Sequence, residues 1–312
     1  MTLLSGNGRA ALATLFMCLA VGCNDLESTP TGDAAENNQN ETPVVVVTSY
    51  PLLVMSQRIA GDWADVSLPI EPPATSRNWK PDTESITAIQ SADAILLNGA
   101  AYDPWAIQAS LPRSRTFDTS IGYSDELLAV EHSVTHQHGP SGTSAGQQII
   151  WATWLDPQLA SAQLSAVQKT LIRLVPDKTE SVSQHAAAFD DEFAALDNRL
   201  EQISEHFVQS TVVVDGPQFG YLLRRLGCQT SFDLGGRDDM ETVISEISAK
   251  KDSDRPQFFF HQSNIEPSVT EQLAASGIRP IEIDLCETER EQSLIERLNA
   301  NLNRIESAAN ER

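Results

Sequence analysis

Residues 177–207, DKTESVSQHAAAFDDEFAALDNRLEQISEHF, decide the fold of this chain. Apolar side chains recur there at alternating spacings of four and three residues: Val182, Ala186, Phe189, Phe193, Leu196, Leu200, Ile203 and Phe207. This spacing places all of them on one stripe of a single helix. About 30 residues at 1.5 Å per residue give a helix of about 45 Å, more than one small lobe needs. We expect a spine, residues 176–208, that runs along two lobes. A dimeric coiled coil is the alternative, although the aromatic residues favour packing against a globular body.

The segments on either side of the spine alternate strands with helices. Before it, the N-terminal lobe at residues 44–175 contains predicted strands at 44–47, 64–70 and 94–99, the last of which ends in a turn. After it, the C-terminal lobe at residues 209–312 contains predicted strands at 212–214, 258–260 (within residues 257–261) and 280–285. Such alternation implies parallel sheets covered by helices. The predicted fold class is α/β, with two lobes, each a mainly parallel sheet flanked by helices, joined by the helical spine.

Composition and charge narrow the functional classes. The chain has 312 residues, 41% of them hydrophobic and 21% charged, which is typical of a soluble protein of about two domains. The 21 Lys and Arg against 43 Asp and Glu give a formal net charge of −22. Such a chain repels phosphate backbones and anionic lipid surfaces, so nucleic acid is not an expected partner. We expect a monomer.

The first 23 residues resemble a bacterial lipoprotein signal. After Arg9, the apolar run from Ala10 to Ala20 is too short to span a bilayer, and small residues lead to Cys23. Cys23 would carry the lipid, and residues 24–43 would form a disordered tether. The alternative is an ordinary secretory signal cleaved nearby. We expect the mature chain in the periplasm or on the outer face of the cytoplasmic membrane, anchored through Cys23.

This signal leaves two cysteines for the folded part of the chain. Cys18 lies within the signal and Cys23 is the lipid site, so Cys228 and Cys286 remain. An exported protein folds in an oxidising compartment, where a leftover pair can bridge. We expect a disulfide between Cys228 and Cys286.

Three of the six histidines gather in one loop, at His132, His136 and His138. Imidazole is a common ligand for transition metals, and a loop rich in Gly and Ser lets three rings converge on one ion. The alternative is a solvated loop whose histidines bind nothing.

A series of motifs runs through nearly the whole mature chain. They are VTSYPL at 47–52, NWKPD at 78–82, IQSADAILLNG at 89–99, DPW at 103–105, WLDP at 154–157, FGY at 219–221 and IDL at 283–285. With the histidine loop and the long helix, they resemble the solute-binding proteins of bacterial zinc and manganese ABC importers, the cluster A-I metal-binding lipoproteins. The resemblance implies a cation held between the lobes and handed to a membrane permease, with no catalysed step. Zn²⁺ is the expected cargo and Mn²⁺ the alternative.

This chain departs from the family at the usual metal site. The family places three His and one Asp or Glu in the cleft, and these positions fall here at Arg77, about Ala152, Gly216 and Asp284. Only Asp284 keeps a side chain that can ligate, and the fixed charge of Arg77 would oppose a divalent cation. The usual cleft site is therefore predicted to be missing.

Three hypotheses for the ligand follow. The first is a metal bound through His132, His136 and His138, with Asp284 if the loop folds over the cleft. The second is an anion or a metal complex, with Arg77 pointing into the cleft. His261, at the carboxyl end of a predicted strand, could face the same cleft. The third, an exported hydrolase, has little support because the sequence contains no HExxH motif.

Overall fold

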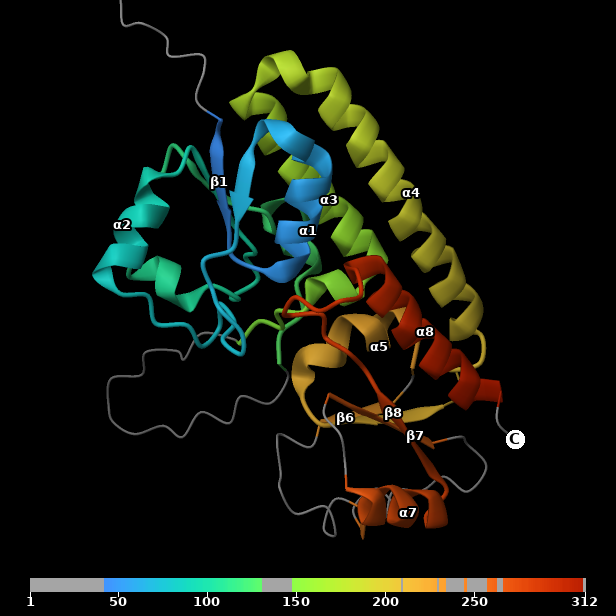
Figure 1. The fold of residues 1–312 in the computed structure, drawn as a ribbon. Coiled ribbons are helices and arrows are strands. Elements are labelled where there is room, and N and C mark those ends of the chain that lie inside the picture. The colour runs from blue at the N-terminus through green and yellow to red at the C-terminus, as the bar shows by residue number, and fades with distance from the viewer. Residues whose placement is uncertain are drawn as a thin grey trace, which may run out of the picture. The chain divides into compact units, whose positions relative to one another are not determined.

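The computed structural model of the chain describes residues 42–130, 148–208, 210–228, 230–233, 244–245, 257–262 and 266–310. The chain from Thr42 onward forms one unit. The described residues of this unit build two four-stranded sheets with helices around them (Figure 1).

All strands of the N-terminal sheet are parallel, in the order β2-β1-β3-β4. Their bounds are β1 (Val44–Val47), β2 (Asp65–Ser67), β3 (Ala94–Leu97) and β4 (Thr116–Asp118). The central strands β1 and β3 are almost wholly buried, which is why they are continuous apolar runs in the sequence. The edge strand β4 was not predicted, because its sequence Thr-Phe-Asp has no fully buried side chain.

Each helix of the N-terminal lobe begins after a side chain that caps its free amides. Ser49 precedes α1 (Tyr50–Ala60), Asp82 precedes α2 (Thr83–Ser91), and Asp156 precedes α3 (Pro157–Leu174). Short 3-10 helices lie in the connections, at Gly61–Trp63, Pro104–Ile107, Ile121–Glu126, Thr153–Leu155, Pro176–Lys178 and Pro217–Phe219.

The C-terminal sheet has the same arrangement, with parallel strands in the order β6-β5-β7-β8. Its strands are β5 (Thr211–Val214), β6 (Thr230–Asp233), β7 (Gln257–His261) and β8 (Ile278–Glu282). Its helices are α5 (Gly220–Leu226), α7 (Pro267–Ala275) and α8 (Leu294–Asn310). Residues 244 and 245 are also helical, and the residues around them, 234–243 and 246–256, lie outside the described residues.

The spine is α4 (Thr179–Ser204), a helix of 26 residues. Seven residues of the predicted stripe, from Val182 to Ile203, are buried on it, and Phe207 is buried just after its end. The helix contacts α1 and α3 of one lobe and α5 and α8 of the other. Figure 1 shows it in yellow, running from the N-terminal helices to α8. The predicted fold class, two α/β lobes joined by a long helix, is confirmed.

One apolar core runs through both lobes. It joins Val45 and Leu96 of the first sheet, Phe193 on α4, and Val212 and Ile305 of the C-terminal lobe, each at most 1% exposed. In the part of the chain that the structure describes, no helix combines the length and hydropathy needed to span a membrane.

Candidate functional site

Loops from the two lobes meet beyond the carboxyl ends of the strands, where ligand sites of parallel sheets gather. The Tyr102 hydroxyl, on the loop after β3, donates to Glu287 Oε1 at 3.3 Å. The Trp154 indole Nε1 donates to the Leu285 carbonyl, after β8, at 2.7 Å. Both donors are buried. These contacts close the cleft between the lobes.

A pocket of about 280 Å³ opens beside the contact between Tyr102 and Glu287. Its walls come from the end of β1, the start of α1, β2 with the loop after it, and the segment after β8. The walls carry three carboxylates, those of Glu71, Glu287 and Glu289, and none of the described residues that line it is Lys or Arg. The pocket therefore favours positive over negative charge.

Arg77 follows Ser76, which lines this pocket, and contacts both lobes. Its guanidinium carbon is 4.1 Å from the centre of the Trp151 ring. Its Nη1 atom is 3.8 Å from Glu287 Oε1. The Arg77 side chain is 42% exposed, whereas that of Glu287 is 10% exposed. Arg77 thus lies in the cleft, as the second hypothesis requires, but its charge already faces a carboxylate of the chain itself.

Burial is the main influence on Glu287 and raises its pKa above the ordinary value. The charge of Arg77 and the hydrogen bond from Tyr102 oppose this shift without cancelling it. The sequence offered no signal for Glu287, because its partners Arg77 and Tyr102 lie about two hundred residues earlier in the chain and meet it only through the fold.

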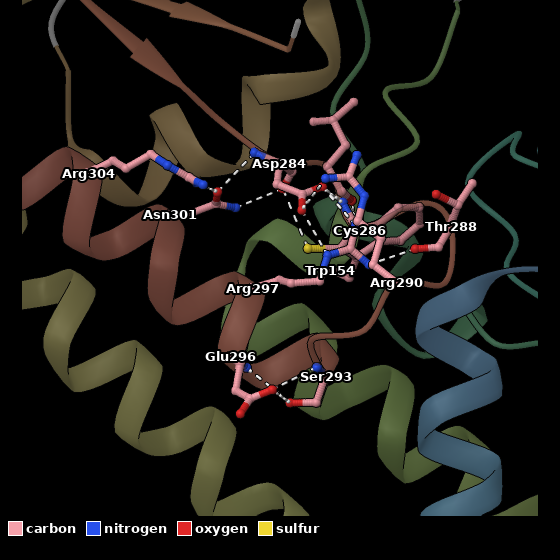
Figure 2. A network of polar contacts seen from close by, with 11 residues as sticks. Trp154, Asp284, Cys286, Thr288, Arg290, Ser293, Glu296, Arg297, Asn301 and Arg304 are labelled. Carbon is pink, nitrogen blue, oxygen red and sulfur yellow. Dashed lines mark hydrogen bonds and ion pairs between the residues drawn. The ribbon is translucent and has the colours of Figure 1, made fainter. Parts of the chain in front are cut away.

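Asp284, the predicted fourth ligand, is engaged by Arg297 of α8 (Figure 2). Arg297 Nε donates to Asp284 Oδ2 and Arg297 Nη2 donates to Asp284 Oδ1, both at 2.8 Å. The Cys286 amide donates to Oδ1 at 2.9 Å, and Arg290 Nη1 is 3.6 Å from Oδ2. Burial alone would raise the pKa of Asp284, but the bonds from Arg297 and Cys286 and the two arginine charges lower it. Both oxygens are occupied, so Asp284 can ligate a metal only by leaving Arg297.

The other two positions of the family's site offer no ligand. Ala152 is fully buried and has no polar side chain. Gly216 is in extended backbone, and the side chain of Gln218 lies in the space that a Cβ there would need. Gln218 Nε2 donates to Asp215 Oδ1 at 2.9 Å.

The predicted ligands His132, His136 and His138 lie outside the described residues. His261 is 5% exposed at the end of β7, with its ring stacked on Phe259 at 5.6 Å. Among the described residues, no three His, Cys, Asp or Glu side chains lie close enough together to hold a metal ion.

The two ends of the histidine loop are nevertheless fixed. Val130 donates to the Gln148 carbonyl and Ile150 to the Leu128 carbonyl, each at 2.8 Å. The Tyr221 hydroxyl, from α5, accepts from the Leu128 amide at 3.1 Å and donates to the Ile150 carbonyl at 2.9 Å. We call residues 128–130 and 148–150 the loop base. The C-terminal lobe therefore anchors a loop base that ends two residues before Ala152.

Cys228 and Cys286 are free cysteines, so the predicted disulfide is not formed in this structure. Cys286 is buried beside Asp284, and its thiol lies 3.5 Å from the Asp284 carbonyl (Figure 2). Burial raises the pKa of each thiol to about 12. The count of cysteines left Cys228 and Cys286 as the one possible pair, but it could not show which residues each thiol contacts in the fold.

The family described as zinc-uptake complex component A, periplasmic, matches residues 45–308, which include both lobes and the spine. The chain belongs to this family. The resemblance predicted from the motifs is thereby confirmed.

Two relatives show how distant the members are. The zinc-binding lipoprotein AdcA of Streptococcus pneumoniae is 22% identical over 270 residues, covering 84% of this chain and 52% of AdcA. The high-affinity zinc uptake system protein ZnuA of Bacillus subtilis is 21% identical over 274 residues, covering 87% of this chain and 82% of ZnuA. The chain thus spans about half the length of AdcA.

Solved structures share the fold. The metal-dependent lipoprotein YcdH of Bacillus subtilis superposes with a TM-score of 0.71 at 18% identity, covering 85% of this chain and 98% of YcdH. The Zn(II)-bound ZnuA-like domain of Streptococcus pneumoniae AdcA gives a TM-score of 0.69 at 18% identity, covering 87% of this chain and all of that domain.

Proposed function

We propose that this chain is an extracytoplasmic solute-binding protein that delivers a divalent cation, Zn²⁺ first and Mn²⁺ as the alternative, to an ABC importer. The supporting observation is the family match across residues 45–308. In this role the protein binds and releases its cargo and catalyses no reaction. We further propose that it acts as a monomer anchored through Cys23, on the periplasmic side or the outer face of the cytoplasmic membrane, and that its partner is the membrane permease.

The cation would bind to the histidine loop and not to the usual four positions. Arg77, Ala152 and Gly216 offer no metal ligand, and Asp284 is held by Arg297. Neutral imidazoles of His132, His136 and His138 suit zinc. Since the loop base ends beside Ala152, a cation on this loop would lie near the cleft. Asp284 would join the site only if its pair with Arg297 opened.

The alternative ligands have weaker support. An anion would meet the carboxylates of Glu71, Glu287 and Glu289 in the pocket, and Arg77 already faces Glu287. For the hydrolase, the spacing Gly-x-Ser-x-Gly does occur at residues 142–146, outside the described residues. The described residues that flank it belong to the antiparallel loop base, whereas a nucleophile elbow joins a strand to a helix.

Metal titration of the mature protein tests this proposal. We expect one bound zinc ion by calorimetry and metal analysis, lost in the triple variant His132→Ala, His136→Ala, His138→Ala. The double variant His185→Ala, His206→Ala removes imidazoles outside the loop and should bind like wild type. Affinity should fall between about pH 7 and pH 5, as the imidazoles take up protons. Undiminished binding by the triple variant would reject the histidine loop as the site.

A further inference from the structure

The Glu287 carboxylate helps to fasten the segment after β8 to the N-terminal lobe, in addition to the hydrogen bond from Trp154 Nε1 to the Leu285 carbonyl. Glu287 accepts the Tyr102 hydroxyl at 3.3 Å and lies 3.8 Å from Arg77 Nη1. Its side chain is 10% exposed, so most of the hydration that a free carboxylate enjoys is lost.

Arg77 is held at this place by a second contact. Its guanidinium lies over the ring of Trp151, which is 7% exposed. The Trp151 ring is also packed against Tyr102 and Trp154, with ring centres 5.5 and 5.7 Å apart. We call the packed rings of Tyr102, Trp151 and Trp154 the aromatic floor. A planar guanidinium suits both a stacking contact and an ion pair, so Arg77 connects the aromatic floor of the N-terminal lobe with the Glu287 carboxylate of the C-terminal lobe.

The burial of Glu287 makes this contact more than an ordinary surface ion pair. Exposed pairs contribute little to stability, and the Arg77 side chain alone would belong to that class. However, removal of one partner from a buried pair leaves the other charge uncompensated. The only positive charge that the described residues place within 4 Å of the Glu287 carboxylate is that of Arg77.

We propose that Arg77 is a tethered cation that keeps the cleft closed by neutralising Glu287, so that closure of the lobes does not depend on a bound metal ion. Without Arg77, the Glu287 carboxylate would regain water by moving away from Tyr102, and the segment after β8 would separate from the N-terminal lobe. The lobes of this chain would then be closed both with and without a bound cation. The inference holds whether or not the histidine loop carries zinc.

The test compares the mature wild-type protein with the variants Arg77→Met and Arg77→Lys, in chelator and with added zinc. Hydrogen exchange is followed in residues 99–103 and 283–289, and the radius of gyration is measured by solution scattering. Wild type should give the same values in both conditions. Arg77→Met should exchange at least tenfold faster in both segments and have a larger radius. Arg77→Lys, which keeps the charge, should remain close to wild type.

A matched control and a rescue separate charge balance from a general loss of packing. Arg58 also pairs with a glutamate, Glu192, and lies over an aromatic ring, that of Phe189 at 4.0 Å, with a side chain 43% exposed. It connects α1 with α4 and should leave both segments unchanged when replaced by Met. The double variant Arg77→Met, Glu287→Gln has no charge to neutralise and should be closed again.

Three results would overturn the proposal. The first is wild-type exchange in Arg77→Met. The second is opening of the double variant to the same extent as Arg77→Met. The third is opening of the wild type itself when zinc is removed. Should Arg77→Met fail to fold, the outcome rests on Arg77→Lys and on Glu287→Gln, both of which must show wild-type exchange with and without zinc.

Discussion

The Asp284 carboxylate lies between two arginines of very different exposure. The Arg297 side chain is 1% exposed and donates two hydrogen bonds to it, whereas the Arg290 side chain is 64% exposed and lies at 3.6 Å. The buried bidentate partner fixes the carboxylate, and the exposed one adds mainly a screened charge. Asp284 therefore acts in the structure as a brace between the segment after β8 and helix α8.

This difference in exposure predicts that replacing Arg297 lowers the free energy of unfolding more than replacing Arg290 does. Arg297→Met should lower the free energy of unfolding by about 3–5 kcal/mol at pH 7, because it removes the buried partner of Asp284 and leaves only the exposed Arg290 charge beside it. Arg290→Ala should cost less than about 1 kcal/mol. The pKa of Asp284 is lowered from 3.8, so its stabilising contribution is complete above that value and is lost as the pH falls through the folded pKa. Urea unfolding at pH 7 and near pH 3 should show the Arg297→Met deficit shrinking in acid, and equal costs for the two variants would contradict this account.

The thiols of Cys228 and Cys286 should be nearly inert in the folded protein. With pKa values of about 12, they carry roughly a thousandfold less thiolate at pH 8 than thiols of pKa 9.0 would. We expect slow alkylation in buffer and rapid alkylation of both in urea without reductant, measured by mass spectrometry. A requirement for reductant in urea would show that the two residues are bridged after all.

Residue identity alone showed that Asp284 could ligate a metal, but not what it contacts. Arg297 belongs to the sequence LIERLNANL, in which a charged residue between apolar positions resembles an ordinary surface residue. Its burial follows from the way α8 packs back on the segment after β8, which brings it onto a carboxylate 13 residues earlier. Pairings of this kind depend on the tertiary fold, so local spacing could not predict them.

At the scale of elements, Tyr221 of α5 is the tie between the C-terminal lobe and the loop base. Its hydroxyl serves two backbone groups, the Leu128 amide and the Ile150 carbonyl. Gly220 allows the close approach, because a Cβ at that position would lie 2.7 Å from Ile150 Cδ1. The loop base is thus braced by the helix that follows the third family position, Gly216.

Tyr221→Phe should therefore loosen the loop base without disturbing the core. Both backbone groups lose their partner, at an expected cost of about 1–3 kcal/mol. Hydrogen exchange in residues 127–130 and 148–151 should quicken. Tyr123→Phe is the matched control, since the Tyr123 hydroxyl contacts the Thr153 hydroxyl at 3.2 Å and not the loop base. Unchanged exchange in Tyr221→Phe would show that the backbone hydrogen bonds between residues 128–130 and 148–150 hold the loop base without Tyr221.

Elements were predictable from the sequence to the extent that their signal is local. The stripe on α4 and the apolar runs of β1, β3 and β5 predicted these elements directly. A helix buried along one stripe, or a strand buried on both faces, has a pattern of apolar residues that is visible within one short segment of sequence. The edge strands β4 and β6, Thr-Phe-Asp and Thr-Ser-Phe-Asp, carry no such pattern. The loop base joins residues on both sides of a long polar loop, so its pairing could not be foreseen either.

At the scale of the whole molecule, the two lobes share one core through α4, and the cleft is closed at its mouth by Glu287, Tyr102 and Arg77. Glu71 and Glu289 line the same pocket as Glu287, and burial raises the pKa of Glu287 there. The cleft should therefore make its own contribution to the pH dependence of stability.

The sign of this contribution follows from the raised pKa of Glu287. The folded protein keeps the Glu287 proton to a higher pH than the unfolded chain, whose pKa lies near the ordinary value of 4.5. The contribution of Glu287 to the free energy of unfolding should therefore fall as the pH rises from 4.5 through the folded pKa, and level off above it. Glu287→Gln cannot ionise, so relative to wild type it should gain stability between pH 4.5 and pH 7.5.

Glu271→Gln, on the exposed surface of α7, removes the same formal charge and should show no such gain. Arg77→Met should flatten the wild-type slope, because the Glu287 carboxylate regains water once the cleft opens and its pKa then returns toward the ordinary value. Urea unfolding across this range measures all four proteins, and a gain in Glu287→Gln no larger than in Glu271→Gln would mean that Glu287 is well hydrated and that the lobes are closed by the aromatic floor alone.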